Sequence, residues 1–94
     1  MTLESKIQAK IIKFLEKQQD CMVIKLTVTN KTGIPDLLVL TWEWRHFWIE
    51  TKQEKWKLSE IQKYRIGVLE AKWDKVIIAY WFEDFIEQFM LITL

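Results

Sequence analysis

The stretch that decides the fold is GIPDLLVLTWEWRHFWIETK, residues 33–52. Two runs of aliphatic and aromatic residues flank a short turn, and this pattern predicts two strands, over residues 36–42 and 45–52. Pro35 stands at the entry to the first strand, where its missing N–H does least harm. Asp36 is therefore expected at the start of one strand, with Glu50 near the end of the next.

The register of these two strands decides which side chains meet. Alternate residues share a face of a strand, so Glu50 and Lys52 point to one side and Thr51 to the other. If residues 42–44 form a three-residue turn, Asp36 stands directly opposite Glu50. A two-residue turn would set Asp36 opposite Thr51 instead, unless a bulge intervenes.

The rest of the chain reads as helices and strands in a simple order, without a linker or repeat. Apolar spacing predicts helices and β-forming runs predict strands. We expect a helix over residues 3–18 capped by Thr2, a strand over 21–28, a helix from a Ser59 cap to about residue 72, a strand over 76–81 and a helix over 82–94. This α-β-β-β-α-β-α order predicts one α/β domain over residues 1–94, with a mixed four-stranded sheet flanked by helices.

Composition excludes several classes of protein. The net charge is +1, which rules out a protein that binds nucleic acid by bulk positive charge. The lone Cys21 has no partner for an internal disulfide, suits a reducing compartment and is expected in the core. No signal peptide and no apolar run of membrane-spanning length is recognisable, so we expect a cytoplasmic protein with no membrane partner.

Two carboxylates and an ammonium group meeting at one point suit a metal and a phosphodiester. Adjacent carboxylates such as Asp36 and Glu50 repel each other unless a cation lies between them. Oxygen ligands without a cysteine–histidine cluster favour Mg²⁺ or Mn²⁺, and no small-molecule cofactor is implied. Lys52 would orient or deprotonate a water, or neutralise a transition state. Glu-x-Lys alone also occurs at Glu4 and Glu70, so a turn residue beside a solvated sheet edge is the alternative interpretation.

Three motifs together resemble one known family. They are Gly33-Ile34-Pro35-Asp36, Ile49-Glu50-Thr51-Lys52 and Leu58-Ser59-Glu60-Ile61-Gln62. In this order, after a helix that carries Glu4, they resemble the virus-type replication–repair nuclease (VRR-Nuc) domain of the PD-(D/E)xK nucleases. The resemblance spans roughly residues 4–80. It departs from the family before the last strand, where a glycine is usual and this chain reads AKWD at residues 71–74.

The resemblance implies a restriction-endonuclease-like fold and metal-dependent cleavage of DNA. It makes Asp36 and Glu50 metal ligands, with the backbone carbonyl of Thr51 as a third. Glu4 matches the family's N-terminal glutamate and would also reach the metal. Its alternative role is that of a favourable acid in the first turn of a helix.

The resemblance also assigns roles to a lysine and a glutamine. Lys52 would be the catalytic lysine, and Gln62 would position that lysine or the substrate. Gln62 has an alternative role, because Ser59-x-x-Gln62 is also a capping box at the start of a helix.

Small stand-alone members of this family resemble resolvases of four-way (Holliday) junctions and act as homodimers, because one such site cuts one strand. A tryptophan-rich hairpin, or the closing helix with Phe85, Phe89 and Met90, would supply the interface. The alternatives are a nuclease directed to flaps or nicks, a non-catalytic module that binds DNA structure, and an interaction protein whose tryptophans bind a partner.

A basic rim beside the site would hold DNA by its phosphates without reading sequence. Its members are Lys31, Lys55, Lys57, Lys63 and Arg65. Trp56 would stack on an unpaired base, or pack against its own domain. His46, about 13 Å from Glu50 along the strand at the usual rise per residue, receives no catalytic role.

Overall fold

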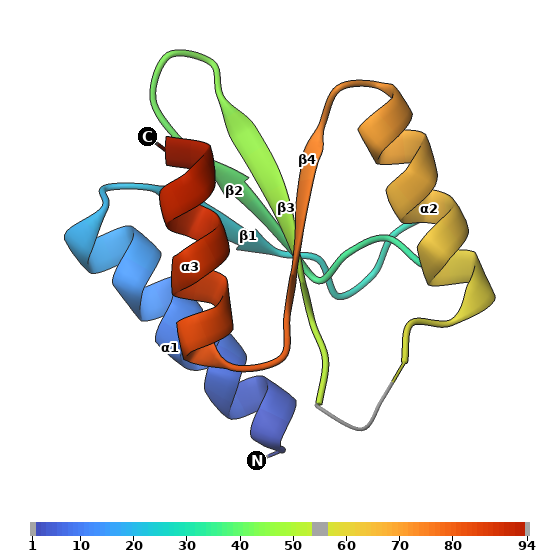
Figure 1. The fold of residues 1–94 in the computed structure, drawn as a ribbon, viewed down its shortest axis with the longest axis horizontal. Helices are drawn as coiled ribbons and strands as arrows, with labels where there is room; N and C mark the ends of the chain where they lie inside the picture. Colours follow the sequence, from blue (N-terminus) through green and yellow to red (C-terminus); the bar gives the residue numbers. More distant parts are fainter. Residues whose placement is uncertain (1, 54–56, 94) are drawn as a thin grey trace.

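The computed structural model describes residues 2–53 and 57–93. Its elements are α1 (Leu3–Gln18), β1 (Met22–Lys25), β2 (Leu37–Leu40), β3 (His46–Thr51), α2 (Glu60–Ala71), β4 (Lys75–Ala79) and α3 (Phe82–Thr93) (Figure 1). The predicted order of helices and strands is confirmed. Thr2 caps α1 as expected, because its hydroxyl accepts a hydrogen bond from the Ser5 N–H at 3.1 Å.

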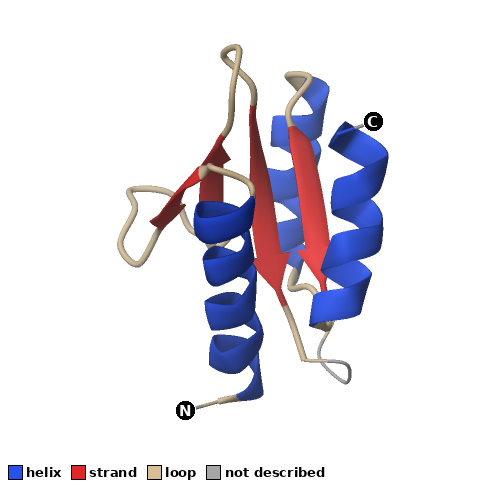
Figure 2. Ribbon diagram, turned by 90° about the vertical axis from the view of Figure 1, so that its left-hand side faces the viewer, coloured by secondary structure: helices blue, strands red, loops and turns tan. Residues whose placement is uncertain are grey.

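The four strands form one mixed sheet in the order β1-β2-β3-β4. β1, β2 and β3 pair antiparallel, and β4 returns parallel to β3 after the α2 crossover. Helices α1 and α3 lie together on one face of this sheet, and α2 covers the other (Figures 1 and 2). The predicted α/β architecture is therefore confirmed.

The register between β2 and β3 is the one that the three-residue turn predicted. Leu37 pairs with Ile49, and this register sets Asp36 opposite Glu50. The Thr41 N–H donates to the Arg45 carbonyl at 2.9 Å, so residues 42–44 form the connection. Glu43 and Trp44 have φ of 56° and 66° there, a left-handed backbone that is uncommon for such side chains.

All four strands are shorter than predicted, and the contacts at the ends of β1 and β4 show why these two stop early. The prediction extended the first strand over residues 21–28, but β1 ends at Lys25. The polar stretch that follows turns on itself, with the Thr29 hydroxyl bonded to the backbone of Lys31. β4 ends at Ala79, two residues early, because the Asp84 carboxylate accepts the Tyr80 N–H at 3.1 Å and starts α3.

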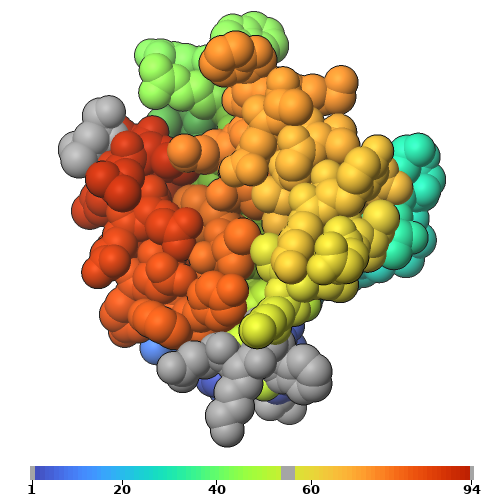
Figure 3. Space-filling view, turned by 45° about the vertical axis from the view of Figure 1, so that its right-hand side comes forward, coloured from blue at the N-terminus to red at the C-terminus, as the bar shows by residue number. Residues whose placement is uncertain are grey.

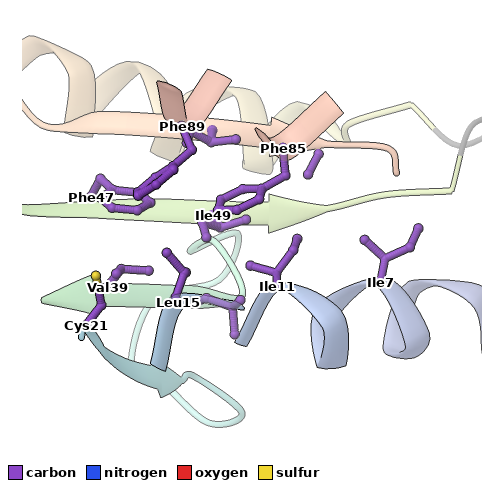
Figure 4. Packing of buried hydrophobic residues seen from close by; sticks show 12 residues of the cluster. Ile7, Ile11, Leu15, Cys21, Val39, Phe47, Ile49, Phe85 and Phe89 are labelled. Carbon is purple, nitrogen blue, oxygen red and sulfur yellow. The ribbon is translucent and has the colours of Figure 1, made fainter. Parts of the chain in front are cut away.

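The core lies between the sheet and the pair α1 and α3 (Figure 4). Phe85 and Phe89 of α3 are both buried there, and their rings stack at a centroid distance of 5.6 Å. The prediction that these two phenylalanines belong to a dimer interface is wrong, because the core already uses both. Cys21 is buried as expected, and this burial raises the pKa of its thiol. No helix in the described part of the chain is long and apolar enough to span a membrane.

Candidate active site

The predicted site residues gather at one end of the sheet, where β2 begins and β3 ends. Asp36 precedes β2, Glu50 and Thr51 close β3, and Lys52 follows with its N–H bonded to the Ala79 carbonyl of β4 at 2.9 Å. The start of α1 lies at the same end of the molecule (Figure 2).

A glycine lets the loop before Asp36 approach α2 closely. Gly33 has φ +84°, and a Cβ placed on it would lie 2.7 Å from the carbonyl oxygen of Ile61. Both the left-handed backbone and the close contact exclude a side chain. Gly33 thus sets the first turn of α2 against the loop that delivers Asp36.

Glu50 is the buried carboxyl of this site, with only 3% of its surface exposed. Burial raises the pKa of Glu50 to about 8, and the negative charge of Asp36 adds to the increase. A hydrogen bond with Asp36 and the charge of Glu4 act in the same direction, while the charge of Lys52 opposes them. The site therefore brings the buried carboxyl of Glu50 together with the half-buried carboxyl of Asp36.

This donor set fits a divalent cation. Both groups offer hard oxygen ligands, and a cation between them would remove the repulsion that keeps a proton on Glu50. Among the residues that the structure describes, no cluster of three or more acidic, histidine or cysteine side chains could hold a metal ion. Asp36 and Glu50 would thus supply two ligands, which backbone groups, water or substrate would complete, and their role as metal ligands stays a prediction.

Glu4 lies near this pair but binds elsewhere. Its carboxylate accepts the Gln53 N–H at 3.2 Å, and its charge contributes to the raised pKa of Glu50. The direct role of Glu4 as a metal ligand stays a prediction, as does that of the Thr51 carbonyl.

Gln62 forms the predicted capping box and also contacts Glu50, while its role in positioning Lys52 or the substrate stays a prediction. Its side-chain oxygen accepts the Ser59 N–H at 2.9 Å, and the Ser59 hydroxyl accepts the Gln62 N–H at 3.2 Å, which completes the capping box. Its amide nitrogen reaches Oε2 of Glu50 at 3.4 Å. The cap of α2 therefore also touches the buried carboxyl of the site.

Two groups at the site were not predicted from the sequence. The side chains of Gln8 on α1 and Thr51 on β3 both bind Oδ2 of Asp36, at 3.0 and 2.8 Å. Gln8 was detectable as a polar residue next to Ile7 on the apolar face of a helix, one turn after Glu4. The Thr51 hydroxyl gave no signal, because threonine is ordinary in a strand.

The basic rim is only partly assembled. Arg65 of α2 donates through Nε to the Thr32 carbonyl at 2.9 Å and so lies against the loop of the exposed Lys31. Figure 3 shows this loop and α2 side by side on the surface. Lys63 pairs with Glu60 at 3.3 Å, and Lys57 is exposed. Lys55 and Trp56 lie outside the described residues.

His46 lies at the other end of β3, as predicted, in a separate network. Its Nε2 and the Trp48 Nε1 bind the two carboxylate oxygens of Asp74, at 3.0 and 2.9 Å. Burial acts to raise the pKa of Asp74, but these two hydrogen bonds outweigh it and lower the pKa. Trp73, within the turn where the family usually has a glycine, has φ of 70°, so the turn forms without one.

Comparison with known proteins supports the fold. No protein-family model and no curated protein sequence matches this chain. Among solved structures, it is similar to one described as a "VRR_NUC domain", with a TM-score of 0.80 and 24% sequence identity. The match covers 88% of this chain and 89% of the other. The chain thus has the fold of a VRR_NUC domain, as its motifs predicted.

Proposed function

We propose that this protein is a nuclease that hydrolyses phosphodiester bonds in DNA with Mg²⁺ or Mn²⁺. The observation that carries the proposal is the buried Glu50 carboxyl paired with the half-buried Asp36, beside Lys52. The pair stands at the strand ends of a fold shared with a VRR_NUC domain.

Each residue then has a defined task. Asp36 and Glu50 would hold the metal, which supplies Lewis-acid polarisation and an activated water when it is bound. Lys52, whose positive charge acts on Glu50, would neutralise the charge that develops on the phosphate or orient the attacking water. Gln62 would hold the Glu50 carboxylate through its amide nitrogen.

A cleavage assay with a matched pair of variants tests this proposal. Asp36→Asn removes one ligand charge with little change of shape. Asp84→Asn makes the same change in a half-buried carboxylate whose hydrogen-bond donors are the Tyr80 N–H and Gln88. We expect wild type and Asp84→Asn to cut DNA with Mg²⁺ or Mn²⁺, and Asp36→Asn or added EDTA to abolish cutting.

The same experiment decides the second candidate function. A folded wild-type protein that binds branched DNA but cuts none, at any Mn²⁺ concentration, would be a non-catalytic binding module. If Asp36→Asn binds DNA but does not cut it, the nuclease is supported, because Asp36 is then needed for cleavage and not for DNA binding.

For the substrate, we propose branched DNA and in particular four-way junctions. Among the described residues, no helix stands out as a base-reading element, and the exposed basic residues beside the site suit phosphate contacts. Junction, flap, nicked and linear DNA of matched sequence should be cut at different rates. Faster cutting of flaps or nicks than of junctions would replace the junction substrate and leave the nuclease standing.

We further propose that two copies associate through a tryptophan surface, defined as Trp42, Trp44 and Trp73. These side chains are 49%, 100% and 96% exposed and border a cleft of about 520 Å³. Three indoles this exposed offer roughly 400–600 Å² of surface, which is about half to three quarters of the roughly 800 Å² that one partner buries in a standard interface.

The charges around this surface favour a second copy over nucleic acid. Glu43 lies beside Arg45, and Asp74 beside Lys75, so both signs are present. Such a mixture can complement itself across a two-fold axis, whereas a nucleic-acid site needs a positive excess. The surface lies at the opposite end of β3 from Glu50, so a dimer formed there keeps both sites open to DNA.

A further inference from the structure

We propose that Gln8 is a positioning residue that sets the affinity of the site for its divalent cation. It acts by fixing which oxygen of Asp36 is presented to Glu50. This inference rests on the proposed nuclease function, and it concerns a residue that makes no contact with the reacting atoms in that scheme.

The hydrogen bonds of Gln8 are short and cross three segments of the chain. Its Nε2 donates to Asp36 Oδ2 at 3.0 Å and to Thr51 Oγ1 at 2.8 Å. An amide nitrogen carries two hydrogens, so both are used. The side chain is only 8% exposed, and these bonds meet little competition from water.

Thr51 completes the arrangement from β3. Its hydroxyl accepts from Gln8 and donates to Asp36 Oδ2 at 2.8 Å. Its backbone N–H donates to the same oxygen at 3.2 Å. Oδ2 of Asp36 therefore accepts three hydrogen bonds, which leaves Oδ1 as the oxygen for a cation.

A carboxylate held in this way binds a cation without first losing rotational freedom. Hydrogen-bond partners that orient a metal ligand typically contribute ten- to hundredfold to metal affinity. A neutral amide suits the position, because a glutamate would add a negative charge and remove the donors. An apolar side chain would remove one of the three donors to Asp36 Oδ2 and the only donor to the buried Thr51 hydroxyl among the described residues.

The test is a Mn²⁺ titration of Gln8→Met, followed by the paramagnetic signal of free Mn²⁺. Gln88→Met is the matched control, because Gln88 also donates two hydrogen bonds, but its acceptors are the Ile78 carbonyl and Asp84 and not Asp36 or Thr51. We expect Mn²⁺ affinity to fall about ten- to hundredfold in Gln8→Met and to be unchanged in Gln88→Met. Saturating Mn²⁺ should restore most of the cleavage rate.

Two further variants make the outcomes distinct. Thr51→Val keeps the shape of a buried side chain, so it tests the same hydrogen-bonded group if Gln8→Met does not fold. This test requires that Asp36→Asn has lost Mn²⁺ binding. Wild-type Mn²⁺ affinity in Gln8→Met then overturns the role of Gln8. If Gln8→Met does not fold, wild-type Mn²⁺ affinity in Thr51→Val has the same meaning. If wild type and Asp36→Asn bind Mn²⁺ equally, the proposed metal site itself is wrong and the inference falls with it.

Discussion

Replacing Glu50 with glutamine should make the metal-free protein more stable while abolishing its function. Glu50 is 3% exposed, and its pKa is raised from 4.5 to about 8, first by burial and then by the charge of Asp36. Ionising this group in the folded state therefore costs free energy that the unfolded chain does not incur. Glu50→Gln keeps the size and removes the charge.

The magnitude follows from the gap between the two pKa values. A group whose pKa is higher in the folded state holds its proton more tightly there, so its stabilising contribution is complete below about pH 4.5 and declines as the pH rises toward 8. At about 1.4 kcal/mol per pH unit, the loss approaches 5 kcal/mol as a ceiling. Glu50→Gln does not undergo this decline. The difference in free energy of unfolding between Glu50→Gln and wild type should therefore be near zero at pH 4.5 and largest above pH 8.

Urea unfolding in EDTA across pH 5–9 measures this effect. Glu60→Gln is the control, because Glu60 is an exposed carboxylate paired with Lys63 on α2. Mn²⁺ should then narrow this gap at pH 8, since a ligand at a hundred times its dissociation constant stabilises wild type by about 2.7 kcal/mol and the variant hardly at all. Parallel pH profiles for wild type and Glu50→Gln, or a less stable variant at pH 8, would refute the reasoning.

Three further predictions concern single features of the fold. Lys52→Met should reduce cleavage by roughly 10²–10⁴-fold while Mn²⁺ affinity, measured by the same titration, is not reduced; a small loss of rate would remove Lys52 from the chemistry. A double variant, Trp44→Ser with Trp73→Ser, should convert a dimer to a monomer in sedimentation, whereas Trp81→Ser, 46% exposed and outside the tryptophan surface, should not; a monomeric wild type would disprove the association. Gly33→Ala should lower the free energy of unfolding by roughly 1–3 kcal/mol, because the added Cβ would lie 2.7 Å from the Ile61 carbonyl oxygen on a left-handed backbone. Gly67→Ala, at a helix position with open space around it, should raise the free energy of unfolding by about 0.5–1 kcal/mol. Equal effects of the two substitutions in urea unfolding would contradict this.

Local patterns made most of the fold predictable from the sequence. Thr2 and Ser59 carry the capping signals of α1 and α2, and both caps form. The register of β2 and β3 follows from the length of one turn, so a three-residue turn is enough to place Asp36 opposite Glu50. Each of these features depends on residues close together along the chain.

Features that depend on distant contacts were less predictable. β1 ends early because a polar turn replaces strand pairing beyond Lys25. The pattern of apolar and polar residues does not show where the turn replaces the strand. Phe85 and Phe89 lie on an apolar helix face that would suit either a core or a partner, and only the packing against the sheet decides. Gln8 meets Asp36 and Thr51 across separations of 28 and 43 residues.

The position of Asp36 explains why the site needs both layers of the fold. On β3, neighbouring side chains face opposite sides, so Glu50 meets Gln62 of α2 while Thr51 meets Gln8 of α1. Asp36 lies where its strand begins, and there its carboxylate can interact with groups from both faces. One oxygen is held from the α1 side, which leaves the other for Glu50 and a cation. A change that separates α1 from the sheet should therefore weaken metal binding even with all of the acidic residues in place.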